Sequence, residues 1–456
     1  MDISKIEKWT FAYAFLKTWI VLFWHGKIYY KKIVISNAEH VPRDGHLIFT
    51  PNHQNALMDP LAIILALKTQ PVFVARSDIF KKPLIAKFLI LIKILPIYRI
   101  RDGFSSLKKN NEVFTKTIDV IENKNGLCVL PEGNHEGHRR LRPFKKGFAR
   151  IAFQTEEAND FKMDIKIVPV GLDYSSYEKC RSVLHINFGK PLPVSDFYEI
   201  YKKNNVKGIN ALKDELSKHL KPLMVNIESE EFYSLYDELR EIYKTQMCKR
   251  LSFPNSEQPY KLKADQALIR ILEKYEKGHM DKMTEFQETV LKYKNRIEKQ
   301  NLSYELIQNG PPPITSLLLR SLMLLILSPI FIYGLIHNYL VYKIPLLIIK
   351  KIKDKQFHSS FKVMISLFVT TFLHIIFTLL FWIFTSSLKL TVIYYISLPL
   401  SGMFAWWYHV QFKNLKMYWR YFSFKRGSES LLKETISLYQ NIIDTTNQIV
   451  DQYSKN

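Results

Sequence analysis

Between residues 31 and 195, short apolar runs alternate with longer segments whose apolar residues recur every three or four positions. The short runs have the length and the β-branched and aromatic content of strands, and they lie at 32–36, 47–50, 72–75, 126–130, 165–171 and 183–189. Segments with helical periodicity lie between them, at 60–68, 82–94, 105–125 and 147–158. This alternation predicts an α/β domain over 31–195 whose sheet is covered on its faces.

Residues 196–313 have a different pattern. They contain few glycines, and Lys, Glu, Tyr and Leu recur with the spacing of charged amphipathic helices. Three consecutive prolines at 311–313 end this region, because proline disrupts a helix interior. We therefore expect a charged helical region after the α/β domain.

Beyond residue 314 the chain becomes strongly apolar, which predicts a membrane region at 314–412. Its two most apolar runs, 361–384 and 390–408, are each about as long as a membrane span, which takes about 20 residues. Only the sequence TSSLK separates them, so we expect a helical hairpin over 361–408. An earlier run at 315–349 is interrupted by Arg320, Pro329, Lys343 and Pro345.

Basic residues predict how these segments cross the membrane. Four lysines follow the run that ends at 349, and five lysines and arginines follow the hairpin, between 413 and 426. Because cytoplasmic loops are enriched in Lys and Arg, both clusters are expected on the cytoplasmic side. The hairpin then crosses twice, and 315–349 must begin and end on that side, as a re-entrant pair or as two tilted spans. The last segment, 413–456, is predicted to be a cytoplasmic polar helix.

The N-terminal residues 1–30 are predicted to form a helix at the membrane interface. The segment Trp9–Trp24 is apolar and rich in aromatic residues, but it contains Lys17 and is short for a span. Aromatic-rich segments of this kind tend to lie among lipid headgroups. We favour this interpretation over a helix buried in the core.

The overall charge indicates an anionic partner. The chain has 456 residues and a formal net charge of +23, from 65 Lys and Arg against 42 Asp and Glu. Together with the apolar blocks and an aromatic content of 14%, this charge favours membrane lipids over nucleic acid as the partner. The three cysteines are scattered, so they predict neither a disulfide framework nor a metal site.

One short stretch, Pro51–Pro60, carries candidate chemistry in the sequence PNHQNALMDP. It follows a predicted strand, and Pro60 favours the first turn of the next helix, which makes Asp59 a natural N-cap. His53 and Asp59 could therefore be a turn residue and a cap. A carboxylate that fixes the tautomer of a histidine is also what activation of a hydroxyl group requires.

Three further stretches follow predicted strands or helices in the same domain. LPIYRIRDG (95–103) places Arg99 and Arg101 in a loop, VLPEGNHEGHRR begins at 129, and IVPVGLDY spans 167–174. Sites in α/β proteins usually form where strands end. The four stretches are therefore expected to meet.

In this order the four blocks resemble those of the phospholipid/glycerol acyltransferase family, which has the lysophosphatidic acid acyltransferase-like fold. The resemblance covers about residues 30–190. The family's first block has four residues between His and Asp, whereas five separate His53 from Asp59. This longer interval is similar to the branch that acylates glycerol-3-phosphate and dihydroxyacetone phosphate. A second departure is Asn134-His135, where many relatives have Thr-Arg.

The resemblance implies a role for each residue. His53 would be the general base that takes a proton from the acceptor hydroxyl, and Asp59 would orient it. Residues that would shape the glycerol-phosphate pocket are Arg99, Arg101, Glu132 and Gly133. On charge grounds, Lys145 and Lys146 would contact phosphate or coenzyme A, although a solvated basic face explains them equally well.

The sequence thus predicts an integral membrane acyltransferase with its catalytic domain on the cytoplasmic face. It would transfer a fatty acyl group from an acyl thioester, either acyl-CoA or acyl carrier protein, to glycerol-3-phosphate in phospholipid biosynthesis. No cofactor and no metal are expected. The nearest alternative acceptor is 1-acylglycerol-3-phosphate. More remote alternatives are a non-catalytic membrane scaffold and a metal-dependent hydrolase that uses His53, His135 and His138.

Overall fold

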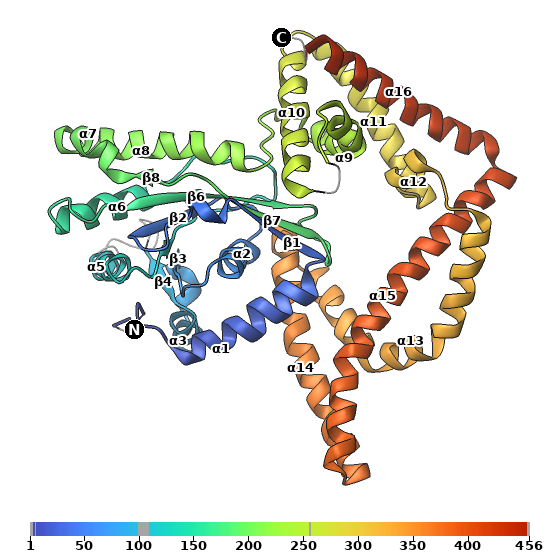
Figure 1. Ribbon diagram of the computed structural model, residues 1–456, viewed down its shortest axis with the longest axis horizontal. Helices are drawn as coiled ribbons and strands as arrows, with labels where there is room; N and C mark the ends of the chain where they lie inside the picture. Colours follow the sequence, from blue (N-terminus) through green and yellow to red (C-terminus); the bar gives the residue numbers. More distant parts are fainter. Residues whose placement is uncertain (1–2, 5, 99–108, 255–256, 454–456) are drawn as a thin grey trace. The chain divides into compact units, whose positions relative to one another are not determined.

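The computed structural model describes every residue except 1–2, 5, 99–108, 255–256 and 454–456 (Figure 1). The chain forms two compact units. The first contains residues 1–226 and a short later segment, Ile352–Val363. The second contains Ile227–Lys351 and Met364–Asn456. The first unit therefore extends past residue 195 and includes two helices of the charged region, α7 (Tyr198–Lys203) and α8 (Asn205–Leu220).

A mixed sheet organises the first unit, and all six predicted strands belong to it. In the described chain the sheet has the order β1-β7-β6-β2-β5-β3-β4, and β8 pairs with β6. The strands are β1 (Lys32–Ser36), β2 (Leu47–Pro51), β3 (Val72–Arg76), β4 (Ile94–Ile97), β5 (Leu127–Cys128), β6 (Lys166–Tyr174), β7 (Val183–Phe188) and β8 (Leu192–Pro193). β6 runs antiparallel to β7 and β8, and the other pairs are parallel.

Strand β4 was not predicted, because its residues continue an apolar run that looks helical. Helix α3 (Pro83–Leu91) ends before it, and Lys93 then adopts a positive φ of 63° that redirects the chain. The buried Lys93 ammonium donates to the carbonyl oxygens of Ile6 and Lys8, at 2.7 and 2.6 Å. Carbonyl groups that accept hydrogen bonds from a lysine can thus stabilise its charge inside the fold. The pattern of hydrophobic residues does not reveal such a buried lysine.

Helices cover both faces of the sheet, as predicted. Alternate residues of β2 supply the two cores, because successive side chains of a strand point to opposite faces. Ile48 packs with α5 (Lys109–Glu122), α6 (Gly147–Ala158) and α8. Phe49 packs with α2 (Met58–Ala66) and with the π-helical segment η1 (Lys17–Tyr29).

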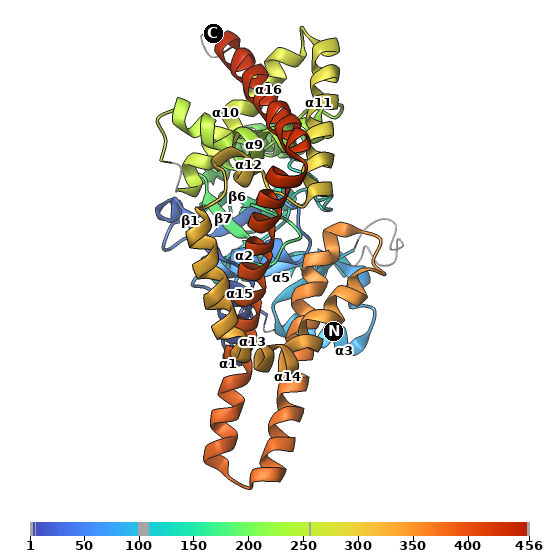
Figure 2. The same cartoon turned by 90° about the vertical axis from the view of Figure 1, so that its right-hand side faces the viewer.

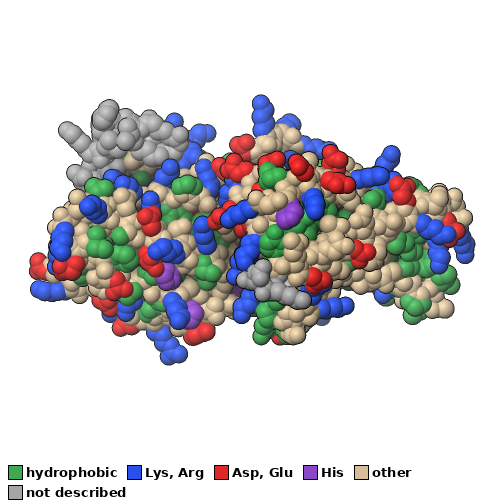
Figure 3. All heavy atoms as spheres, turned by 90° about the horizontal axis from the view of Figure 1, so that it is seen from above, with side chains coloured by type: hydrophobic (Ala, Val, Ile, Leu, Met, Phe, Trp, Pro, Cys, Tyr) green, Lys and Arg blue, Asp and Glu red, His purple; other side chains and the backbone are tan. Residues whose placement is uncertain are grey.

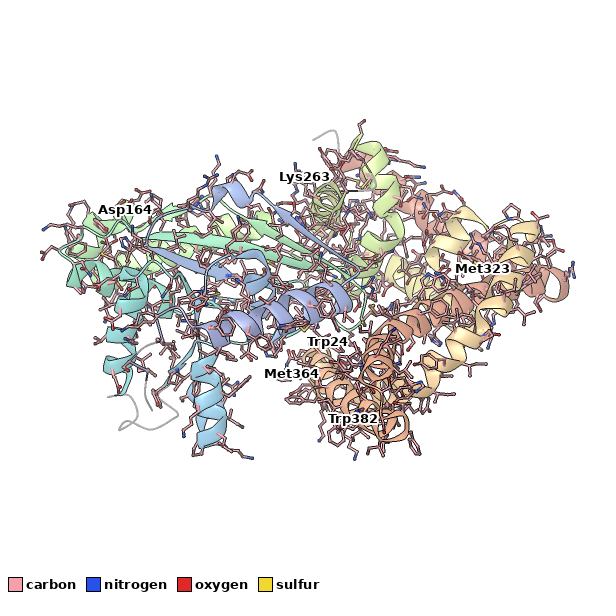
Figure 4. All side chains as sticks on the ribbon, turned by 60° about the horizontal axis from the view of Figure 1, so that its bottom comes forward. Trp24, Asp164, Lys263, Met323, Met364 and Trp382 are labelled. Atoms are coloured by element: carbon pink, nitrogen blue, oxygen red, sulfur yellow. The ribbon has the colours of Figure 1, made fainter. Side chains whose placement is uncertain are left out.

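The N-terminal helix has one buried and one exposed side. α1 (Phe11–Leu16) continues directly into η1, and Trp24 on η1 packs against the core (Figure 4). The exposed side carries large aromatic and aliphatic residues, namely Trp9, Phe11, Phe15, Trp19, Leu22 and Phe23. The helix therefore contacts the core and also presents an uncovered apolar face, which is the arrangement that an interfacial helix requires.

Every strand or helix described in the second unit is a helix. Its polar part contains α9 (Tyr233–Arg250), α10 (Gln258–Glu276), α11 (Met280–Gln300), α12 (Tyr304–Asn309) and α16 (Glu429–Tyr453). The C-terminal helix α16 packs on α10 and α11. Its Asp451 pairs with Arg250 at 2.5 Å.

Among the described residues, three helices are long and apolar enough to cross a membrane: α13 (Ile314–Ile349), α14 (His358–Thr385) with the turn before it, and α15 (Leu388–Gly427). α14 and α15 are the arms of the predicted hairpin (Figure 2), and Trp382 lies on α14 (Figure 4). α15 continues through the basic cluster after 412 without a break.

Helix α13 is continuous, not the pair of segments predicted for 315–349. It contains Pro329 and Pro345 and is visibly bent (Figure 1). Hydrogen bonds join it to α15. These contacts are Leu324 with Tyr408, Tyr333 with Ser397, and Tyr342 with Gly402. The middle of α13, from Tyr333 to Tyr342, thus lies against residues 397–402 of α15.

Candidate active site

The first, third and fourth sequence blocks meet at the carboxyl ends of three neighbouring parallel strands. β2 leads into His53, β5 leads into Glu132, and β6 ends at Tyr174. In the sheet β2 lies between β6 and β5, so the three ends are adjacent. The prediction that strand ends bring these blocks together is confirmed for them.

His53 and Asp59 form a hydrogen-bonded pair. The His53 Nδ1 atom lies 2.9 Å from Asp59 Oδ2. The Asp59 side chain is fully buried, whereas the His53 side chain keeps 15% of its surface exposed. Because an ionised carboxylate can only accept, Nδ1 carries the hydrogen and the lone pair of Nε2 remains available. This is the tautomer that a general base needs.

Asp59 organises the whole loop and not only the histidine. Its Oδ2 also accepts the backbone N–H groups of Gln54 and Asn55, each at 2.8 Å. The expectation that Asp59 is the N-cap of the next helix is wrong. Leu57 occupies the cap position, and Asp59 lies in the first turn of α2. Ala56 adopts a positive φ of 40°, which lets the loop fold back over the carboxylate.

Two residues missed by the sequence reasoning hold this arrangement. The Tyr174 hydroxyl donates to Asp59 Oδ1 at 2.7 Å, and the Tyr174 side chain is buried. Asn52 bridges to β6, accepting from the backbone N–H of Leu172 at 2.6 Å and donating to its carbonyl at 3.1 Å. Tyr174 ends the IVPVGLDY block, so the motif marked the right place without indicating which side chain acts.

Glu132 supports the backbone around His53. Its Oε1 accepts the backbone N–H of His53 at 2.7 Å, and its Oε2 accepts that of Arg142 at 3.2 Å. The residue is 2% exposed. Burial raises the pKa of the Glu132 carboxyl to about 8, an effect that the two backbone donors reduce. Any influence of Glu132 on a substrate pocket would act through these backbone contacts.

The other expected binding residues lie around this centre or outside the described residues. Gly133 has a φ of 69°, and the aliphatic part of Lys145 packs beside it. Lys146 lies immediately before α6. Arg99 and Arg101 lie outside the described residues. Lysines and arginines are interspersed with acidic residues over the face shown in Figure 3, where no single basic patch stands out.

A second histidine lies against the first. The rings of His53 and His135 meet edge to face with centroids 4.9 Å apart, and His135 is 8% exposed. Within the described residues, no group of three or more His, Cys, Asp or Glu side chains is arranged to hold a metal ion. In the described structure the two imidazole rings contact each other and are not part of a metal-binding cluster.

Comparison with known proteins decides the family of this domain. Residues 32–173 match the family model described as Acyltransferase. Residues 32–173 form an acyltransferase domain. The match begins at β1 and ends within β6, so it includes His53, Asp59 and Glu132.

Relatives of this acyltransferase domain include proteins named glycerol-3-phosphate O-acyltransferase and proteins named 1-acyl-sn-glycerol-3-phosphate acyltransferase. Glycerol-3-phosphate O-acyltransferase 1 of Saccharomyces cerevisiae is 26% identical over 147 residues, 31% of this chain and 19% of the yeast protein. This chain therefore spans about a fifth of that relative. A 1-acyl-sn-glycerol-3-phosphate acyltransferase of Borreliella burgdorferi is 24% identical over 201 residues, 42% of this chain and 74% of the bacterial protein.

A solved structure is also similar to part of this chain. It is the crystal structure of the 1-acyl-sn-glycerophosphate acyltransferase of Thermotoga maritima, with 18% sequence identity. The match covers 47% of this chain and 78% of that one, with a TM-score of 0.30.

Proposed function

We propose that this protein is a membrane-bound acyltransferase that moves a fatty acyl group from an acyl thioester to the hydroxyl group of a glycerol phosphate. The observation that carries the proposal is the 2.9 Å contact between His53 and the buried Asp59, within a domain that matches the acyltransferase family. This contact favours a catalytic role over that of a non-catalytic membrane scaffold.

The chemistry needs a base and no covalent enzyme intermediate. His53 Nε2 takes the proton of the acceptor hydroxyl as its oxygen attacks the thioester carbonyl carbon. Asp59 stabilises the imidazolium that forms, since it already accepts the Nδ1 hydrogen. When the carbon–sulfur bond breaks, the imidazolium returns the proton to the leaving thiolate. The products are the ester and a free thiol, and His53 is neutral again.

Glycerol-3-phosphate is the proposed acceptor, with 1-acylglycerol-3-phosphate as the second candidate. The five-residue interval between His53 and Asp59 and the yeast relatives favour the first. The bacterial relative, of which this chain covers a larger share, favours the second. Arg99, Arg101, Lys145 and Lys146 are the proposed phosphate or coenzyme A contacts, because guanidinium and ammonium groups bind phosphate well.

The protein would lie at the cytoplasmic face of a membrane. Support comes from the three long apolar helices, the exposed aromatic side of the N-terminal helix, and the basic clusters at 350–355 and 413–426. A product with a fatty acyl chain is amphipathic, so release into a bilayer would be direct. Either acyl-CoA or acyl carrier protein would serve as the thioester donor.

One assay tests this proposal. The full chain is purified in detergent, returned to lipid vesicles, and given each of the two acceptors with acyl-CoA or with acyl carrier protein. We expect one acceptor to be acylated with at least one donor, and free thiol to appear in equal amount. Acyl transfer no faster than that of a matched His53→Ala preparation, with all four combinations, would overturn the proposal.

A further inference from the structure

Residues Ile352–Val363, which we call the strap, belong to the compact unit of the acyltransferase domain although about 180 residues separate them from β6 in sequence. The strap contains a short 3₁₀ turn, Lys355–Phe357, and the first residues of α14. Val363 at its end is 1% exposed and is part of the core that contains α2. The strap is therefore anchored in the domain and is not a free linker.

The strap holds the loop that carries His53. Ser360 Oγ accepts the backbone N–H of Leu57 at 3.1 Å, at the start of α2. Ser359 Oγ donates to the carbonyl oxygen of Tyr177, which also accepts from the side-chain amide of Asn55 at 3.4 Å. Both serines are buried. Ser360 thus contacts the loop between His53 and Asp59 directly, and Ser359 is linked to it through the carbonyl group of Tyr177.

The strap also covers His135. The ring of Phe357 meets that of His135 edge to face with centroids 4.8 Å apart, and the His135 ring also meets that of His53, with centroids 4.9 Å apart. The His135 Nδ1 atom is buried and has no hydrogen-bond partner in the described structure. His135 is thus a buried imidazole enclosed between the proposed base and the strap.

We propose that the strap completes the acyl-transfer site: Phe357 keeps water away from His135, and Ser359 and Ser360 fix the loop that presents His53. This inference rests on the proposed acyl transfer for its kinetic consequences only. Phe357, Ser359 and Ser360 are positioning residues, because they act on the substrate through His135 and the His53 loop.

Sealing His135 has an electrostatic consequence. Burial and the neighbouring His53 lower the pKa of His135, which an interaction with Gln356 partly offsets. Charged groups that also act on the ring are Asp59, which raises its pKa, and Arg76, which lowers it. An uncharged His135 does not repel the positive charge that forms on His53 in the transition state. Water at the ring would let His135 become protonated and oppose that charge.

The test compares two phenylalanines of the strap. Phe357→Ala removes the ring that covers His135, and Phe361→Ala is the matched control because Phe361 is 43% exposed. Phe357→Leu keeps an apolar cover. The first readout needs no catalysis: each protein reacts briefly with diethyl pyrocarbonate, and carbethoxylation of His135 and of His53 is measured by peptide mass spectrometry.

We expect His135 to be modified several-fold faster in Phe357→Ala than in the wild type, Phe361→Ala or Phe357→Leu. Equal rates in all four proteins would overturn the proposal that Phe357 seals His135. The labelling rates can be measured even if no acyl transfer is found. The proposal for the strap and the proposed function can therefore be rejected independently. Circular dichroism confirms that each variant is folded.

The second readout is the pH dependence of kcat/KM. An exposed histidine has a pKa of about 6.5, so the ratio of Phe357→Ala to wild type should fall by about tenfold between pH 8.5 and pH 5.5. The added substitution His135→Gln should abolish that fall, since glutamine carries no charge at either pH. A constant ratio across this range would show that Phe357 acts only on folding or packing.

Discussion

The Tyr174 hydroxyl donates a 2.7 Å hydrogen bond to Asp59 Oδ1, while Asp59 Oδ2 accepts from His53. The two oxygens of one buried carboxylate thus join the end of β6 to the loop after β2. Because Tyr174 acts on the histidine through Asp59, it is a positioning residue of the proposed base.

Tyr174→Phe should lower kcat more than it changes KM. A hydrogen bond to a charged group contributes about 1.5–3 kcal/mol, so loss of this one should reduce kcat by about 10- to 150-fold. Tyr13→Phe is the control, because the Tyr13 hydroxyl is buried and has no partner in the described chain. Steady-state kinetics of both variants give the answer. Equal kcat values would show that Tyr174 does not position the His53–Asp59 pair.

Glu132 should make stability depend on pH. Its folded pKa of about 8 lies above the ordinary value of 4.5, so the folded state holds one more proton than the unfolded state between these pH values. Its contribution is fully present below pH 4.5 and is lost as pH rises through 8, by at most about 1.4 kcal/mol per pH unit.

The corresponding measurement is Tm of the wild type and of Glu132→Gln between pH 5 and pH 8.5. The variant keeps the shape of the side chain but cannot titrate. We expect the Tm of the wild type to decline relative to that of Glu132→Gln as pH rises. Parallel curves would show that Glu132 is ionised in the folded protein throughout this range.

Arg99 lies outside the described residues, so its role remains a prediction from the sequence. If it binds the acceptor phosphate, Arg99→Ala should raise the acceptor KM by about 10- to 150-fold, the value of a charged hydrogen bond. The KM for the thioester donor serves as the internal control and should change little. An unchanged acceptor KM would assign Arg99 a structural role.

The strap constrains how the chain crosses the membrane. Residues 352–363 contact the acyltransferase domain, so they lie on its side of the membrane. Residues 227–254 and 257–313 contain no helix that could span. We therefore expect helix α13 to begin and end on that same side, which would give the even number of crossings predicted from the sequence.

Cysteine labelling tests this topology. In a Cys180→Ser background, which removes the exposed native thiol, cysteines at Ser386 or Ser387 should react with an impermeant thiol reagent in intact cells. Cysteines at Lys353 or Ser428 should react only after permeabilisation. Labelling at Lys353 from outside would mean that α13 crosses once, and the topology would then be wrong.

Many features of the domain could be predicted because each depends on a short stretch of sequence. Strand length and apolar content located β1, β2, β3, β5, β6 and β7, and the His53–Asp59 pair lies within a single ten-residue stretch. The pairing of these two side chains needed only the loop between them. Sequence spacing is informative for contacts of this range.

The missing features come from distant parts of the chain. Tyr174 is 115 residues from Asp59, and Ser360 is 303 residues from Leu57. Neither contact leaves a periodic pattern, because a single hydroxyl in a strand or at a helix start looks like any other. β4 was missed for a different reason: its residues extend an apolar run, and the break depends on the positive φ of Lys93.

The role of His53 as general base is tested by the rate of acyl transfer by purified His53→Ala protein, compared with that of the wild type, with Tm measured for both proteins. Removal of a general base costs on the order of 10²–10⁴-fold in rate, and His53 is partly exposed, so the fold should survive the substitution. We predict a loss of this size with an unchanged Tm. Near-normal turnover by His53→Ala would show that His53 is not the general base.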